Sequence, residues 1–161
     1  MRWRLADRVE SFEPWREIRG RKAVSLEEYE LLAPLGREGA CPESLVLESC
    51  VEFARWLVAA SSNFEKTCVL EAVGDFRFLE EAGMGDSLAV AVAAAGERGK
   101  VSGPLAVKAP DTFSLFALQC RVERQGRPVA AGGIVVGLLP LAEGYDREAV
   151  ECLWRELHGA P

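Results

Sequence analysis

The sequence has little of what several large classes of protein need. It has one histidine, His158, and its five cysteines are widely scattered with no CxxC pair, so a Cys/His metal site is not expected. No apolar run approaches the roughly 20 residues that span a bilayer, and residues 1–7 lack the apolar core of a signal peptide. We therefore expect a cytoplasmic protein with no membrane partner, whose thiols are reduced and mostly buried.

A cluster of basic residues is also missing. The chain has 19 Lys and Arg against 25 Asp and Glu, which gives a formal net charge of −6. A nucleic-acid partner would require a basic face that displaces counterions from phosphate, so this partner is excluded. The 161 residues, of which 49% are hydrophobic, fit one domain over 1–161 with a sizeable core. Nothing in the pattern calls for a cofactor, and we predict none.

The most informative segment is predicted to be a long helix from Glu43 to Ala60. No Gly or Pro interrupts it, and Pro42 stands where proline is favoured, at the opening of a helix. Apolar side chains cover most of its circumference, and a helix that is apolar nearly all round is a buried one. These side chains are Leu45, Val46, Cys50, Val51, Phe53, Ala54, Trp56, Leu57 and Val58.

Alternating apolar and polar residues predict strands on both sides of this helix. A turn at Pro14 separates the first two strands, a capped short helix follows Ser25, and residues 123–127 form a tight hairpin. Asp146 caps a last helix. Because the strands follow one another without helices between them, the sheet should be antiparallel and the class α+β. The predicted strands are 7–12, 17–24, 67–78, 87–95, 104–108, 113–123 and 128–139.

Three segments together resemble the FabZ/FabA-type 3-hydroxyacyl-ACP dehydratases, more closely the FabZ side. They are Asp-Arg-Val with Phe-Glu-Pro at 7–14, Pro-Glu-Ser-Leu-Val-Leu-Glu-Ser-Cys at 42–50, and Phe-Arg-Phe to Gly-Asp-Ser-Leu at 76–88. The resemblance implies the hotdog fold, in which a curled antiparallel β-sheet wraps a long central helix. It extends to about Leu139, so residues 101–112 look like an insertion and the helix at 144–158 like an addition.

The resemblance also implies a chemistry and its residues. The family removes an α-proton with a histidine in the loop before the helix, while a carboxylate on the helix helps the hydroxyl leave as water. Here Glu48 stands at the carboxylate position, but Pro34 stands at the histidine position. Backbone N–H groups at the helix start, next to Cys41 and Pro42, would polarise the thioester carbonyl.

Further residues are predicted to bind the substrate, each with a simpler alternative. Glu43 could narrow the mouth of the acyl tunnel, or it could be a stabilising first-turn acid. Glu52 replaces the family's glutamine, and Phe76 could contact substrate or pack in the core or a dimer contact. Cys41 could be a nucleophile, although most single cysteines are inert.

Glu48 itself has two interpretations. A poorly solvated carboxylate facing the tunnel would be suited to general acid or base work. Alternatively, the residue is a charge paired with Arg55 or with a partner subunit, since Glu48, Glu52 and Arg55 share one helical strip.

The predicted function is to act on or bind acyl-ACP or acyl-CoA thioesters in fatty-acid or polyketide-type metabolism. Without the histidine, dehydration should be weak. One alternative is a hotdog thioesterase in which Glu48 activates water, and another is a non-catalytic acyl-binding subunit of an active homologue. The resemblance further implies a homodimer, with a higher oligomer or a heterodimer with a homologue as alternatives.

Overall fold

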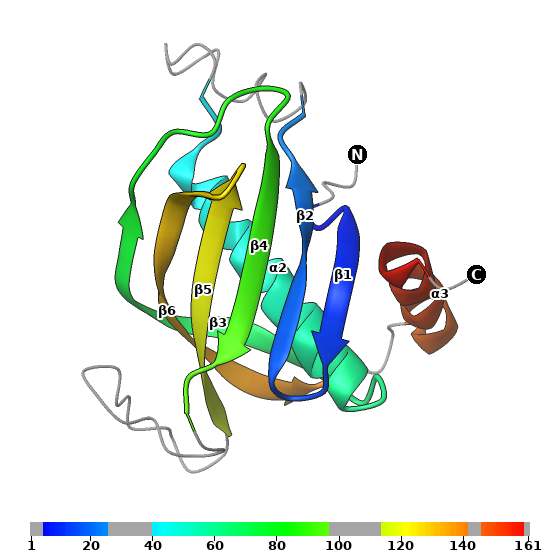
Figure 1. Ribbon diagram of the computed structural model, residues 1–161. Coiled ribbons are helices and arrows are strands. Elements are labelled where there is room, and N and C mark those ends of the chain that lie inside the picture. The colour runs from blue at the N-terminus through cyan, green and yellow to red at the C-terminus, as the bar shows by residue number, and fades with distance from the viewer. Residues whose placement is uncertain (1–4, 26–39, 97–113, 142–145, 160–161) are drawn as a thin grey trace.

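Six strands and two helices make up the described part of the computed structural model, which comprises residues 5–25, 40–96, 114–141 and 146–159 (Figure 1). The strands are β1 (Arg8–Glu13), β2 (Glu17–Ala23), β3 (Lys66–Phe78), β4 (Ser87–Ala94), β5 (Leu115–Arg124) and β6 (Arg127–Pro140). The helices are α2 (Glu43–Ser61) and α3 (Arg147–His158). The bounds of the strands and of α2 agree with the sequence expectations to within two residues. α3 begins at Arg147, and residues 144 and 145 of the expected last helix lie outside the described residues. The predicted strand 104–108, the helix after Ser25 and Pro34 lie outside the described residues.

The strands form one antiparallel sheet in the order β1-β2-β4-β5-β6-β3. The sheet curls around α2, which crosses its concave side diagonally (Figure 1). The apolar circumference of α2 explains this position, because ten of its residues are buried. The fit is tight at Gly20 of β2, where an added Cβ would lie 2.5 Å from the Phe53 ring. The expectation of a long helix wrapped by an antiparallel sheet is therefore met.

Two short features set the register of the sheet near β6. The hairpin between β5 and β6 turns at Gln125 and Gly126, both with positive φ, as a tight two-residue hairpin requires. The pair Gly132-Gly133, which the sequence marks as a turn or bulge, lies inside β6, and the irregularity is in the opposite strand β3. An added Cβ at Gly132 would lie 2.3 Å from the Phe76 Cα, so glycine makes room for that irregularity.

The two edges of the sheet are treated differently. The β1 edge is accompanied by α3, whose Trp154 ring lies 5.2 Å from the Phe12 ring in an edge-to-face contact (Figure 1). Asp146 caps α3 as predicted, since its carboxylate accepts hydrogen bonds from the N–H groups of Glu148 and Ala149. The β3 edge has no such cover within the described part of the chain. In the described segments, α3 thus covers the β1 edge, and the β3 edge is open.

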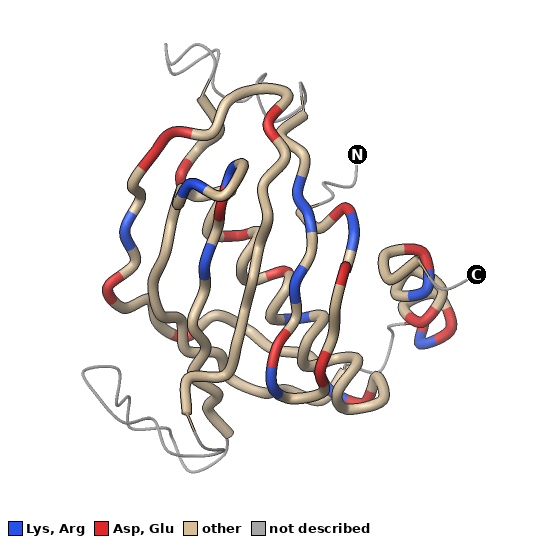
Figure 2. Tube along the Cα trace, in the orientation of Figure 1, with Lys and Arg blue, Asp and Glu red and all other residues tan. Residues whose placement is uncertain are grey.

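Charged residues of both signs are interspersed along β1, β2 and α3, whereas β4 carries no charge at all (Figure 2). In the segments described, neither helix is both long and apolar enough to cross a membrane.

Candidate functional site

The start of α2 is held at one end of the sheet. The Cys41 N–H donates to the Ala82 carbonyl at 2.6 Å, and Ala40 bridges to Gly83, so the loop after β3 positions this segment. Pro42 is the N-cap residue and provides no side-chain hydrogen bond to the helix. The first-turn N–H groups and the positive end of the helix dipole therefore mark the place where a carbonyl oxygen would be polarised.

A polar strip, consisting of Glu48, Glu52 and Arg55, runs along α2 from this end. Arg55 Nη1 donates to Glu48 Oε1 at 2.9 Å and to Glu52 Oε2 at 3.1 Å. Burial opposes the charge of Arg55, but the hydrogen bonds and charges of Glu52 and Glu48 outweigh it and raise the pKa of the guanidinium. The strip thus contains one cation held between two carboxylates.

Glu48 is found in the ion pair that the sequence offers as the simpler alternative. Its side chain is 39% exposed in the single chain, so the poor solvation expected of a buried general acid is not present there. Glu48 and Glu52 are brought together through Arg55, one turn apart. Cys41, Pro42 and Glu43 lie in sequence at the helix start, about 7 Å of helix rise before Glu48.

The remaining predicted residues occupy different environments. Glu43 is exposed in the first turn, where an acidic side chain stabilises the helix. Phe76 is half-buried on β3, with its ring 5.3 Å from that of Phe78, and packs against the core. It lies on the sheet, at the end from which the chain continues toward Ala82, rather than on the strip itself.

None of the five cysteines forms a disulfide, and three of them are buried. Burial raises the pKa of the Cys68 thiol to about 12, against a lowering influence of Arg55. The hydrogen bond with Cys120, followed by burial, raises the pKa of Cys50 well above its usual value. Both thiols therefore stay protonated at neutral pH and are poor nucleophiles. Within the described ranges, no group of His, Cys, Asp and Glu is placed to hold a metal ion.

A cavity of about 600 Å³ lies beside the polar strip, between α2, the start of β3 and α3. Its lining includes Glu52 and Arg55 together with the apolar faces of the two helices. Sequence reasoning did not predict this cavity. The available signal was the i, i+3, i+7 spacing of Val150, Leu153 and Leu157, which predicts an apolar face on the last helix but not what it covers.

Comparison with known proteins identifies the fold. A hot-dog-like protein from Thermanaerovibrio acidaminovorans superposes with a TM-score of 0.59 at 16% identity, covering 92% of this chain and 96% of that one. A hypothetical thioesterase with coenzyme A from Streptococcus pneumoniae TIGR4 superposes at 0.56, with 12% identity over 84% of this chain and 87% of that one. The E. coli PaaI protein from the phenylacetic acid degradation operon superposes at 0.55, with 14% identity over 81% of each chain.

The fold is the hotdog fold. Because the sequence identities are low, these similarities establish only the fold, and they do not point to the dehydratase family that the sequence resembles. No protein-family model matches the sequence, and neither does any curated protein. The α+β class, predicted from the succession of strands, and the hotdog fold, implied by the resemblance, are therefore confirmed.

Proposed function

We propose that this hotdog protein binds acyl-CoA thioesters along α2 and hydrolyses them, with Glu48 as the catalytic carboxylate. The observation that carries the proposal is the position of Glu48, on a solvent-accessible strip about 7 Å of helix rise beyond the start of the helix. At that spacing, the helix start can bind the carbonyl oxygen while the carboxylate accepts a proton from the attacking water. The coenzyme A in the structure of the hypothetical thioesterase from Streptococcus pneumoniae supports the choice of thioester.

In this proposal each part of the site has one role. The backbone N–H groups after Cys41 and Pro42 bind the carbonyl oxygen and stabilise its developing charge. Arg55 holds Glu48 Oε1, and Oε2 takes a proton from water as the water oxygen attacks the carbonyl carbon. The proton then passes to the leaving sulfur, which gives a carboxylic acid and a thiol. Glu43 borders the entrance, and Glu52 and Phe76 contact the acyl group.

Dehydration of 3-hydroxyacyl groups is the less favoured reaction. It requires a base to remove the α-proton, and a positioned base commonly contributes about 10²–10⁴ in rate. Pro34, at the family's histidine position, has no side-chain proton acceptor. Glu48 would have to serve as both base and acid, whereas hydrolysis can use one carboxylate for both proton transfers.

The proposed active form is a homodimer joined through β3. Among the described residues, the five large apolar side chains that are exposed all lie on β3 or in the segment after it: Val69, Leu70, Val73, Leu79 and Met84. An open edge strand with such side chains favours pairing with a second strand, and two-fold pairing of identical strands closes both edges. Because Glu52 and Arg55 line one cavity together with Cys68 of β3, the polar strip runs beside this edge. A second copy would reduce its solvation.

A non-catalytic acyl-binding subunit is the second candidate. The ion pairs of Arg55 with Glu48 and Glu52 favour it, since they give both carboxylates a structural partner. In this case thioesters would bind without turnover. An acyl carrier protein thioester in place of the CoA thioester fits either candidate.

Glu48→Gln and Glu52→Gln are a matched pair that tests the proposal, because each removes one of the carboxylates bound to Arg55. With acyl-CoA substrates and detection of free CoA, Glu48→Gln should lower kcat at least about 100-fold in a folded protein. Glu52→Gln should act mainly on KM. Equal losses in both variants would show that the strip is structural. A wild type that binds thioesters but turns over none would favour the non-catalytic acyl-binding subunit. Alkene formation from 3-hydroxyacyl-CoA would instead favour dehydratase activity.

A further inference from the structure

The cavity between α2, β3 and α3 is built from two facing helical stripes. On α2 the stripe consists of Glu52, Arg55, Trp56 and Ala59, at spacings i, i+3, i+4 and i+7. On α3 it consists of Val150, Leu153 and Leu157. The charged residues of the lining, Glu52 and Arg55, lie on the part of α2 nearest Glu48, whereas Thr67 at the start of β3 is uncharged. The other lining residues are apolar apart from the Cys68 thiol, so the charge of the lining lies at the end toward Glu48.

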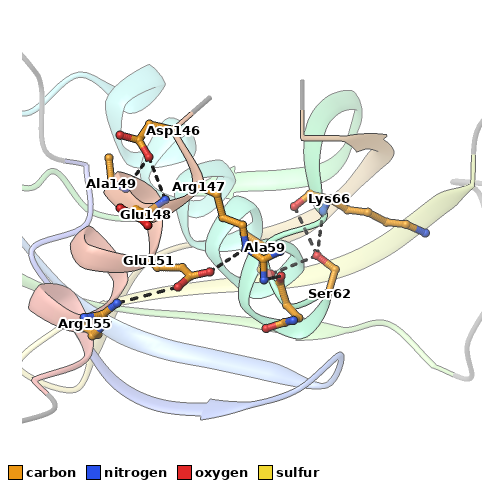
Figure 3. Close-up of polar contacts among 10 residues, drawn as sticks. Ala59, Ser62, Lys66, Asp146, Arg147, Glu148, Ala149, Glu151 and Arg155 are labelled. Carbon is orange, nitrogen blue, oxygen red and sulfur yellow. Dashed lines mark hydrogen bonds and ion pairs between the residues drawn. The ribbon is translucent and has the colours of Figure 1, made fainter. Parts of the chain in front are cut away.

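The wall formed by α3 is fixed at both of its ends. At the start, Arg147 Nη2 donates to the Asn63 carbonyl at 3.1 Å, and Arg147 Nε pairs with Glu151 at 2.8 Å (Figure 3). Farther along, the Trp154 ring lies 5.8 Å from that of Trp56 on α2. The helix ends at Gly159, which has the positive φ typical of a helix C-terminus. These contacts hold α3 at a set distance from α2, with the cavity between the two helices.

The charges around the cavity disfavour an anionic occupant. Arg55 is the cation on its lining, and it is already bonded to Glu48 and Glu52. A ligand carboxylate would have to compete with both for the same guanidinium, and would meet their repulsion. The Cys68 thiol, with a pKa of about 12, is neutral at physiological pH. An uncharged apolar group fits this lining best, since apart from Thr67 and the neutral Cys68 thiol the remaining lining residues are hydrophobic.

We propose that this cavity receives the uncharged, apolar far end of a medium-length acyl chain and so sets the chain-length preference of the protein. The inference rests on the proposed binding of thioesters along α2. A thioester next to Glu48 directs its acyl chain past Arg55 and into the cavity, because Glu52 and Arg55 belong both to the strip and to the lining. A volume of about 600 Å³ lies within the usual range of small-molecule pockets and is far more than an acetyl group fills.

Two adjacent residues of α3 provide a matched test. Val150 lines the cavity, whereas Ala149 is exposed on the outer side of the helix. Dissociation constants of acetyl-CoA, octanoyl-CoA and suberyl-CoA, whose chain ends in a carboxylate, are measured by calorimetry for the wild type, Val150→Trp and Ala149→Trp. The wild type should bind octanoyl-CoA at least tenfold more tightly than either of the other two. Val150→Trp should abolish this preference with acetyl-CoA binding unchanged, and Ala149→Trp should retain it.

Further outcomes separate the cavity from the proposed function. Free 1-octanol is a probe that needs no thioester, and it should bind to the wild type and to Ala149→Trp but not to Val150→Trp. If octanol binds in this way while no acyl-CoA does, the cavity is an apolar binding site and the proposed thioester function is contradicted. If acyl-CoA binds with no chain-length preference, or if Val150→Trp leaves the preference intact, the cavity proposal is overturned. If the Val150→Trp protein does not fold, the same measurements are made with Val150→Phe.

Discussion

Both edge strands of the sheet, β1 and β3, have backbone N–H and C=O groups that no neighbouring strand bonds, but within the described chain only the β1 edge is covered. At β1, α3 lies along the edge, and Trp154 contacts both Phe12 and Trp56. At β3, the described chain supplies no cover, and the side chains of Val69, Leu70 and Val73 are more than one-third exposed. An apolar open edge is an aggregation hazard unless it is paired. Among the described residues, one edge is therefore covered by a helix, and the other is the edge at which the proposed dimer would form.

The largest effect is expected from a charge on the open edge. Val73→Lys should place like charges across the two-fold contact between two β3 strands and weaken dimerisation by about 3–4 kcal/mol, roughly 10²–10³-fold in dissociation constant. Sedimentation at micromolar concentration should then show the mass of a single chain, whereas the wild type should show two.

The control for this variant is Ser11→Lys, an exposed position on β1. If the two edges differ as described, Ser11→Lys should leave the mass unchanged. A wild type that sediments as a monomer, or a Val73→Lys protein that remains a dimer, would contradict the assignment of β3.

The covered edge is tested by removing its aromatic contact. Trp154→Ala deletes a ring that lies 5.2 Å from Phe12 and 5.8 Å from Trp56. Because Trp154 is only partly buried, the free energy of unfolding should fall by about 2–3 kcal/mol, less than the full cost of a core tryptophan. Amide hydrogen exchange in β1 should rise, because α3 no longer stays on that edge.

Cys152→Ala, at an exposed position on the same helix, serves as the comparison for Trp154→Ala. Both proteins need to be compared at one chain concentration, since association contributes to apparent stability. Equal stability of the two variants would mean that α3 contributes nothing to the β1 edge.

A smaller, pH-dependent effect is expected where the chain leaves the open edge. Asp86 Oδ2 accepts hydrogen bonds from the Gly83 N–H at 2.7 Å and from Arg124 Nη1 at 2.9 Å, and these two donors lower the pKa of Asp86. A lowered pKa in the folded protein stabilises it at pH values above the unfolded pKa, and this contribution disappears as the pH falls through the folded pKa. Asp86→Asn should therefore cost about 1–2 kcal/mol at pH 7 and little at pH 2.

Urea unfolding at the two pH values measures this difference. Arg124→Gln should also destabilise the protein at pH 7, and the double variant should lose less than the sum of the two single losses, because the two residues act on each other. Additive losses, or a loss from Asp86→Asn that is as large at pH 2 as at pH 7, would refute the assigned coupling.

Most of the fold could be predicted from the sequence because each element carries its own local signal. The apolar circumference of residues 43–60 predicted a wrapped helix, and the alternation in residues 87–95 predicted a strand with one buried face. The order of strands in the sheet has no such local signal. It depends on which strands pair across long stretches of chain, and the sequence analysis predicts an antiparallel sheet without predicting the order of its strands.

The candidate site was predictable in part. Spacing placed Glu48, Glu52 and Arg55 on one strip, and the structure joins them in hydrogen bonds. Spacing could not decide between a catalytic carboxylate and an ion pair, because that depends on what covers the strip. The cavity could not be predicted either, since it requires knowing that Val150 and Leu153 face Trp56.

The position of β3 at the end of the sheet also has a consequence for synthesis of the chain. β3 is the third strand of the described sheet to be synthesised, but it pairs only with β6. Lys66 therefore has no pairing partner until Pro140 has been synthesised. Until residues 127–140 have left the ribosome, both sides of this apolar strand lack their backbone partners. The sheet therefore cannot be completed during most of translation, and such distant pairing is slow to form. A nascent chain stalled before β6 should be the form of this protein that binds chaperones most strongly.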